Sequence, residues 1–366
     1  MSAYDCLVVG AGPAGAAAAA ELARRGRRVI ILERGRLPRR KCCAGGVPLK
    51  VASLPGLDLA GVPASPIRGA VHSWKGKPGL EVSESETLGW VVDRARFDQV
   101  LVEAAQAAGA ELVEGTDARL GRNSASGVAI TAAGRCWEGK TLIAADGASG
   151  AVSRRLGFRS PQRGFGLEVS LRPPPAVQES FGGRLFFDFG LIPRGYAWIF
   201  PGPGFLNLGA AVRRPRDRGL LLLLEEYARL QGLGEWFDPS AVRGAPLAFP
   251  SRRLVPVRGC CLAAGDAAGL VDRLTGEGIY PALRSGLLAA RSVDAFLQGG
   301  SLAGYRPALR DELLADLVWS VRLSRLQDWF PGPTYRRAVL NPRRAHKMLL
   351  IGLGKLRYRD LFRRRS

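Results

Sequence analysis

The sequence predicts an α/β protein with a Rossmann-type nucleotide-binding domain, an inserted antiparallel β-sheet and a helical C-terminal region. Residues 4–9 are typical of a buried parallel strand; a glycine turn and an Ala-rich helix to about Arg25 follow. A second strand over 29–32 completes one βαβ unit. Alternating residues and Pro/Gly turns over 163–213 indicate the antiparallel sheet, and helical patterns dominate the chain's end.

The chain is long enough for more than one domain, with 366 residues of which 47% are hydrophobic. We expect residues 1–150 and 255–300 to interleave into the nucleotide-binding domain. Residues 151–254 are expected to form a β-sheet substrate domain. Residues 301–366 are expected to form a helical, basic C-terminal region, and no internal repeat or low-complexity linker separates these parts.

The net charge of +21 is concentrated in two segments. Residues 331–366 hold eleven Lys and Arg against one acidic residue, Asp360, and residues 21–50 are similarly basic. A general preference for Arg accounts for part of this excess. Binding to an anionic membrane or to an acidic partner protein would also account for it. No recognised nucleic-acid module is present, so we expect no nucleic-acid partner.

The sequence indicates a cytoplasmic protein. It has no signal-peptide pattern and no apolar run near 18 residues. Its cysteines do not form a secreted disulfide framework, and no metal site is expected because there are only two His and no C-x-x-C. The cysteines are Cys6, Cys42, Cys43, Cys136, Cys260 and Cys261.

Residues 10–15 match G-x-G-x-x-G between the first strand and its helix. Gly10 permits the tight turn, Gly12 lets a pyrophosphate approach the backbone, and Gly15 lets the helix pack on the strand. The helix N-terminus then faces the phosphate charge. Glu33, at the end of the second strand, can accept hydrogen bonds from ribose hydroxyls.

Two further segments favour FAD over NAD. Residues 141–147 resemble the A-D-G segment of glutathione-reductase-type flavoproteins, and 263–268 resemble their G-D-A segment. That resemblance implies that Asp266 meets the ribityl chain or adjoining phosphate, and that Arg94 begins a helix contacting FAD. Only one G-x-G-x-x-G occurs, so we expect a transient electron donor, either NAD(P)H or a carrier such as ferredoxin.

Residues 193–201 match P-x-x-Y-x-W-x-F-P at every fixed position. With Lys41-Cys42-Cys43-Ala44-Gly45-Gly46 and the Thr-Gly-Glu-Gly-Ile-Tyr segment at 275–280, the sequence resembles the geranylgeranyl reductase family over roughly residues 4–300. These flavoenzymes saturate isoprenoid chains on lipids, quinones and pigments. With the glycines above, the resemblance assigns the following residues to the FAD site: Ala14, Glu33, Arg34, Cys43, Ala44, Gly46, Arg94, Ala118, Asp266, Gly278 and Ile279.

The same resemblance places Tyr196 and Trp198 against the substrate as catalytic residues, with Phe200 and Pro201 also contacting it. Strand alternation puts Tyr196, Trp198 and Phe200 on one face. Saturating an unpolarised alkene requires hydride on one carbon and a proton on the other, and aromatic faces stabilise the intervening cation character. Cys43 is a candidate proton donor or redox thiol; alternatively, it is a small residue packed under the flavin.

Two other functions remain open at this point. A flavin-dependent monooxygenase or halogenase of the same superfamily is one, because residues 196–201 are a near match to W-x-W-x-I-P; a redox-neutral role is the other. The mixed apolar and basic residues 334–366 suggest peripheral contact with an anionic membrane. The same tail would also suit a solvated terminus or a docking surface for an acidic electron carrier.

Overall fold

A mostly parallel sheet is one of the two large sheets of the computed structural model, which describes residues 4–59, 61–124, 127–158, 160, 162–213, 219–251 and 254–361. The path through this sheet is β17-β18-β11-β1-β2-β8, with β10 and β9 branching from β11. The strands are β1 (Tyr4–Val9), β2 (Val29–Leu32), β8 (Glu111–Val113), β9 (Arg119–Ser124), β10 (Gly127–Ala132), β11 (Arg135–Ala144), β17 (Val257–Arg258) and β18 (Cys261–Ala263). The continuous apolar runs of β1 and β2 are buried because the sheet is covered on both faces.

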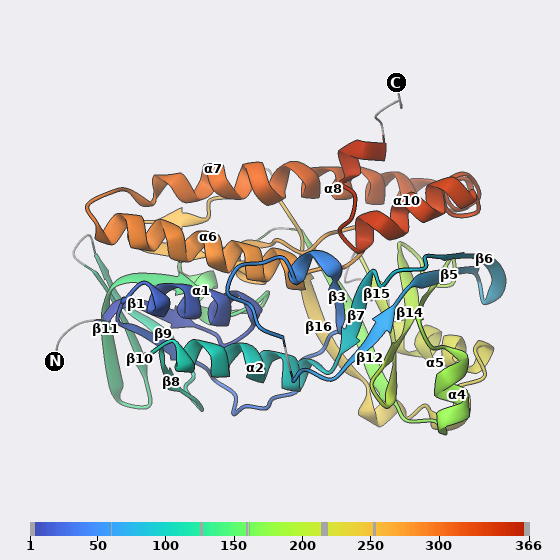
Figure 1. Cartoon of the computed structure of the whole chain (residues 1–366), viewed down its shortest axis with the longest axis horizontal. Coiled ribbons are helices and arrows are strands. Elements are labelled where there is room, and N and C mark those ends of the chain that lie inside the picture. Colours follow the sequence, from blue (N-terminus) through green and yellow to red (C-terminus); the bar gives the residue numbers. More distant parts are fainter. Residues whose placement is uncertain are drawn as a thin grey trace.

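Helices α1 (Pro13–Arg24), α2 (Arg94–Ala107) and α6 (Ile279–Leu297) cover this sheet (Figure 1). The small residues of α1 allow close helix packing: a Cβ added at Gly286 of α6 would lie 2.2 Å from the Ala14 oxygen. Asp93 caps α2 by accepting hydrogen bonds from the N–H groups of Ala95 and Arg96. The predicted βαβ unit and the predicted helix after Asp93 are thus confirmed.

The second sheet has the order β16-β12-β15-β14-β13-β5-β6. Its strands are β5 (Gly69–Trp74), β6 (Lys77–Ser83), β12 (Arg163–Leu171), β13 (Arg184–Phe189), β14 (Gly195–Gly202), β15 (Phe205–Val212) and β16 (Arg243–Ala248). All neighbours are antiparallel except β5 and β13, which run parallel. Helix α5 (Leu220–Leu230) buries Leu224 and Tyr227 against one face.

The structure differs from the sequence-based division at residues 64–92. β5 and β6 lie in the second sheet, although residues 1–150 were expected to belong to the nucleotide-binding domain. β5 pairs with the edge of β13 along its whole length, which satisfies backbone groups that an exposed edge would leave open. A small sheet of β3 (Gly46–Pro48), β7 (Gly89–Val92) and β4 (Ala64–Ile67) joins the two parts.

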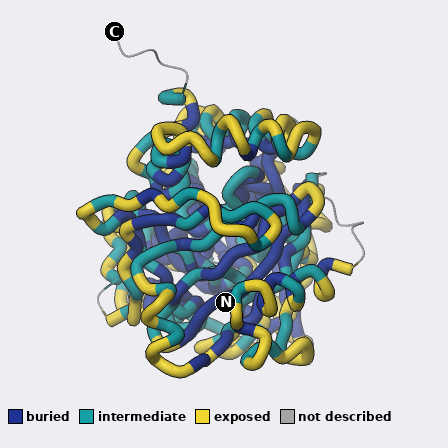
Figure 2. The backbone as a smooth tube through the Cα atoms, turned by 90° about the vertical axis from the view of Figure 1, so that its right-hand side faces the viewer, coloured by how far each residue is buried: buried dark blue, intermediate teal, exposed yellow. Residues whose placement is uncertain are grey.

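A C-terminal helical layer runs along both sheets (Figure 1). Its main helices are α7 (Tyr305–Leu309), α8 (Ala315–Trp329), α9 (Pro331–Thr334) and α10 (Pro342–Gly352). α10 buries Ala345 and Leu349 in a cluster with Ile67 and Ala70. The described part of the basic tail is therefore folded, and its arginines are exposed. Figure 2 shows the exposed and partly buried backbone of this layer near the C-terminus. Residues 362–366 lie outside the described residues. Among the helices described, none combines the length and hydrophobicity needed to cross a bilayer.

Candidate functional site

The glycine turn before α1 forms a cradle whose three glycines have different surroundings. Gly10 has φ +101°, and a Cβ added there would lie 2.4 Å from the Ala145 oxygen. A Cβ on Gly15 would lie 1.9 Å from the Gly10 oxygen. At Gly12 the nearest atom is an Arg39 guanidinium nitrogen at 3.8 Å. Space therefore remains beside Gly12 at the uncapped N-terminus of α1, which fits a pyrophosphate.

Glu33 holds the cradle from the end of β2. One carboxylate oxygen accepts the Ala11 N–H at 2.7 Å, and the other accepts the Gly35 N–H at 2.9 Å. Arg39 pairs with the same carboxylate at 3.2 Å. Glu33 is buried, whereas the neighbouring Arg34 is exposed. The structure thus places Glu33 beside the cradle, and its contact with a ribose stays a prediction.

The loop that carries Cys43 lies against the start of α2. Arg94 donates to both oxygens of Asp98, at 2.8 and 3.1 Å, and all of these groups are buried. Burial alone would lower the pKa of Arg94, but Asp98 and Cys43 outweigh it, so this pKa is raised. Cys43 accepts the Gly45 N–H at 3.4 Å. Arg94 and Asp98 thus form a buried ion pair beside the loop that the sequence assigns to the flavin.

Asp266 lies opposite that loop, in the turn between β18 and α6. Burial raises the pKa of its carboxyl, while the charges of Lys41 and Arg94 oppose the increase. A Cβ added at Gly278, the residue before α6, would lie 3.6 Å from an Asp266 oxygen. The predicted residues from the two ends of the nucleotide unit therefore converge. Ala118 is buried in the first core, and its contact with FAD stays a prediction.

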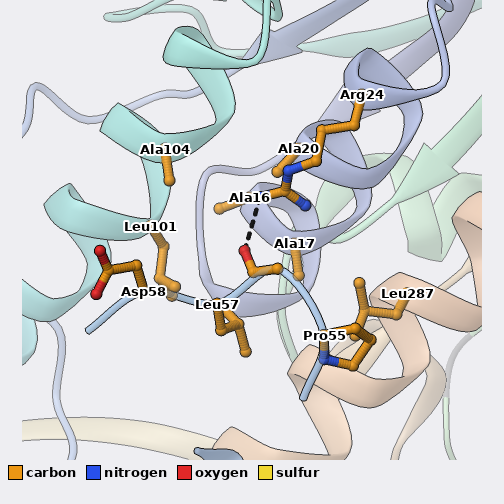
Figure 3. Close-up of a pocket in the computed structure, with 11 residues that line it drawn as sticks. Ala16, Ala17, Ala20, Arg24, Pro55, Leu57, Asp58, Leu101, Ala104 and Leu287 are labelled. Carbon is orange, nitrogen blue, oxygen red and sulfur yellow. Dashed lines mark hydrogen bonds between the residues drawn. The ribbon is translucent and has the colours of Figure 1, made fainter. Parts of the chain in front are cut away.

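Figure 3 shows the side of α1 that carries Ala16, Ala17 and Ala20, where the structure leaves a cavity of only about 10 Å³. Arg24 donates to the Gly56 oxygen at 2.7 Å and draws the loop carrying Leu57 onto the helix (Figure 3). Such a space holds at most one water. The nucleotide therefore has room at the glycine end of α1 and not along this side.

One face of β14 presents the aromatic residues predicted from its motif. The Tyr196 and Trp198 ring centroids are 5.9 Å apart, and those of Trp198 and Phe200 are 6.4 Å apart. Phe187 and Phe189 of β13 continue this surface. Further rings come from His72, Trp74 and Tyr335. We call these eight residues the aromatic face.

Pro201 does not share the aromatic face, although it was predicted to contact the substrate with Phe200. It pairs with Leu206, and strand alternation turns it towards the core beneath α5. The fixed φ of proline suits this position because the pairing of β14 with β15 ends one residue later, at Gly202.

Trp198 is held by a chain of two polar residues, Asn207 and Glu168, whose role the sequence does not indicate. Its indole N–H donates to Asn207 at 2.8 Å, and Asn207 donates to Glu168 at 2.8 Å and to the Cys43 carbonyl at 3.4 Å. Glu168 and Asn207 are 3% and 2% exposed. Burial raises the pKa of Glu168. The available signal was a single polar residue, Asn207, in the apolar strand β15, and an acidic residue, Glu168, within the largely apolar strand β12.

Gly209 leaves the space that the Trp198 indole ring occupies. It lies opposite Trp198 in the β14–β15 register, and a Cβ there would lie 2.1 Å from the indole ring. The indole therefore lies over β15 because position 209 has no side chain.

The C-terminal layer anchors the loop beside Tyr196. The Tyr196 hydroxyl donates to the Thr275 carbonyl at 2.6 Å. Asp272 turns this loop by accepting the Leu274 and Thr275 N–H groups, and its other oxygen accepts the Tyr358 hydroxyl at 2.9 Å. Tyr358 is buried, so the last 60 residues, which carry no recognisable motif, contribute directly to the site.

His72 is the unusual member of the aromatic face. It is 7% exposed, and neither imidazole nitrogen has a hydrogen-bond partner among the described residues. Burial lowers the pKa of His72 to about 4. An unpaired buried polar group costs about 1–3 kcal/mol. The surroundings of His72 are thus apolar, and its buried, unpaired imidazole lowers the stability of the folded protein.

The site is that of an FAD-dependent oxidoreductase. It combines the glycine cradle and the polar residues Glu33, Arg94 and Asp266 with the adjoining aromatic face. A family model described as an FAD binding domain matches residues 3–171. A menaquinone reductase of Mycobacterium tuberculosis is 34% identical over 321 residues, covering 80% of this chain and 76% of that protein. A geranylgeranyl diphosphate reductase of Rhodobacter capsulatus is 30% identical, covering 83% and 78%.

The solved structure of a geranylgeranyl bacteriochlorophyll reductase-like protein from Thermoplasma acidophilum has the same fold. The TM-score is 0.81, the identity 20%, and the match covers 96% of both chains. From these matches, the chain belongs to the geranylgeranyl reductase family. The sequence-based assignments of fold, FAD and family are therefore confirmed.

Proposed function

We propose that this protein reduces C=C bonds of a prenyl chain carried by a lipid, quinone or pigment. The observation that carries the proposal is the direct link between the flavin loop and the aromatic face, through Asn207 between Cys43 and Trp198. The names of the two relatives support it, since one is a geranylgeranyl diphosphate reductase and the other a menaquinone reductase.

Bound FAD, once reduced, supplies hydride equivalents to one alkene carbon. The chain's own residues must then bind an apolar substrate, exclude water and deliver a proton to the other carbon. The cradle at Gly12, Arg94 and Asp266 would hold the cofactor. Tyr196 and Trp198 present aromatic surfaces that are each 8% exposed. Such surfaces bind a prenyl chain and stabilise cation character as the proton arrives.

Glu168 is the proton donor favoured by burial and position. It lies on the same sheet face as Trp198, because Glu168 is opposite Gly209 and Gly209 is opposite Trp198. Its raised pKa favours the protonated form that a general acid requires. Cys43 remains the second candidate, because its thiol is at the flavin loop beside Arg94. A transient NAD(P)H or carrier protein would supply the electrons.

Peripheral membrane contact forms part of the proposal. Leu326, Trp329 and Phe330 at the end of α8 are 52%, 74% and 55% exposed, and exposed Arg336 and Arg337 follow. Apolar side chains flanked by arginines suit an anionic bilayer surface. Sedimentation with anionic but not neutral vesicles would support this contact. Binding to an acidic carrier protein without vesicle binding would instead support a carrier-docking role for these arginines.

Product mass tests the proposed function. Purified protein should be yellow and, with dithionite and a geranylgeranyl substrate, should yield products heavier by multiples of two hydrogens. Trp198→Ala should lower this yield while keeping the flavin spectrum. Unchanged substrate mass with FAD bound and reducible would contradict the proposal, and substrate-dependent oxygen consumption would favour a monooxygenase or halogenase.

A further inference from the structure

A cavity of about 510 Å³ lies at the end of the aromatic face, outside the residues assigned to FAD or to the prenyl chain. It is formed where α8 crosses the ends of β12 and β15. Four arginines and one carboxylate dominate its walls. The lining residues are Gln162, Arg163, Arg213, Phe249, Arg273, Arg325, Asp328 and Trp329.

The described residues that line the cavity carry more positive than negative charge. Asp328 is shared by Arg213 at 2.8 Å and Arg273 at 2.9 Å, so one carboxylate serves two guanidinium groups. Arg325 makes no ion pair within the described ranges. The pKa of Arg273 is lowered mainly by burial; the charges of Arg213 and Arg325 add to the decrease, and Asp328 only partly offsets it. An anion in this cavity would relieve that repulsion.

The cavity continues the aromatic face along the strand direction. Arg213 follows Ala211 by two residues, and Ala211 is opposite Tyr196, so Arg213 lies on the same face about 7 Å further along. The two regions also share a loop, since Arg213 donates to the Arg273 carbonyl at 3.0 Å and Tyr196 to the Thr275 carbonyl. A molecule with an apolar chain and an anionic end matches this order of surfaces.

We propose that this cavity binds the phosphate or diphosphate group of the substrate while its prenyl chain lies along the aromatic face. The inference rests on the proposed function and narrows the substrate to a phosphate-bearing prenyl compound. Guanidinium groups match phosphate because they donate two parallel charge-assisted hydrogen bonds. Arg325 is the arginine we expect to contribute most to phosphate binding, because it makes no ion pair within the described ranges. Arg213 and Arg273 are paired with Asp328 and also hold the loop beside Tyr196.

The first experiment measures binding of inorganic pyrophosphate to the FAD-loaded protein by calorimetry. Arg325→Glu should weaken it at least about tenfold, because a charged hydrogen bond contributes about 1.5–3 kcal/mol. Arg322→Glu is the matched control: Arg322 makes the same charge change on the same helix but stacks on Trp319 outside the cavity. No pyrophosphate binding, or equal weakening by both variants, would overturn the proposal.

The second experiment uses turnover to identify the source of the phosphate. Arg325→Glu should raise KM for geranylgeranyl diphosphate about tenfold with little change in kcat, and should leave geranylgeraniol unaffected. Competition of pyrophosphate with NADPH instead of geranylgeranyl diphosphate would assign the cavity to the electron donor and overturn the proposal. Pyrophosphate binding that geranylgeranyl diphosphate displaces, without reduction of any prenyl compound, would support the cavity while contradicting the proposed function.

Discussion

The shapes of the glycine cradle and of the aromatic face are determined in different ways. The cradle is local: three glycines within six residues set its shape, and only Gly12 leaves open space. The aromatic face is assembled from β5, β13, β14 and the segment around Tyr335, which are far apart in the sequence. A binding site made by backbone conformation is thus visible in a short motif, whereas one made by packed side chains depends on sheet register.

Substitutions in the cradle should have the strongest consequences and should separate cofactor binding from folding. Gly12→Val should abolish the bound flavin absorbance while preserving the fold, because its extended backbone accepts a side chain that then fills the pyrophosphate space. Gly15→Ala should instead lower the melting temperature, because its Cβ would overlap the Gly10 oxygen. Gly304→Ala, in open space, is the control. FAD retained by Gly12→Val would show that the cradle is not the site.

Glu168→Gln should reduce kcat by about 10²–10⁴-fold, because the amide can still accept from Asn207 but supplies no acidic proton. The wild-type rate should fall as pH rises through the raised pKa of Glu168, since only the protonated carboxyl donates; this alkaline decline should disappear in the variant. Glu179→Gln, an exposed position, is the control. An unchanged pH profile in Glu168→Gln would return the role to Cys43.

Gly209→Ala tests whether register alone shapes the aromatic face. The added methyl would displace the Trp198 ring, and misplacement by about 1 Å costs about 100-fold in rate. The flavin spectrum should persist. Gly166→Ala on the same sheet face is the matched control, because its Cβ would lie 3.7 Å from the nearest atom, the Ala210 oxygen. Equal activity in the two variants would mean that the indole position is unimportant.

A weaker effect, on stability alone, is expected at His72. Its folded pKa is about 4 against an ordinary value of 6.5, so only the unfolded chain gains a proton as pH falls between these values. The folded protein should lose about 3 kcal/mol over this range. His72→Phe should flatten the decline and raise stability at neutral pH, measured by urea unfolding. A variant that keeps the wild-type decline would place the sensitive group elsewhere.

Short segments of the sequence were enough to predict the βαβ unit, the FAD cradle and the presence of three aromatic residues on one face of a strand. These features follow from glycine spacing, apolar runs and the two-residue period of a strand, which are local properties. The sequence did not reveal Asn207, Glu168 or Gly209, because each acts across a strand pair. Nor did it reveal that residues 69–83 belong to the second sheet.

Only the tertiary structure shows that the C-terminal segment contributes to the site. As a sequence, that segment is a basic, mixed tail with no motif, but Tyr358 is buried and hydrogen-bonds Asp272 beside the site. The position of such a residue depends on which surfaces remain uncovered after both sheets have formed. Charge and composition are sums over a segment, whereas a buried hydrogen bond requires two particular atoms to meet.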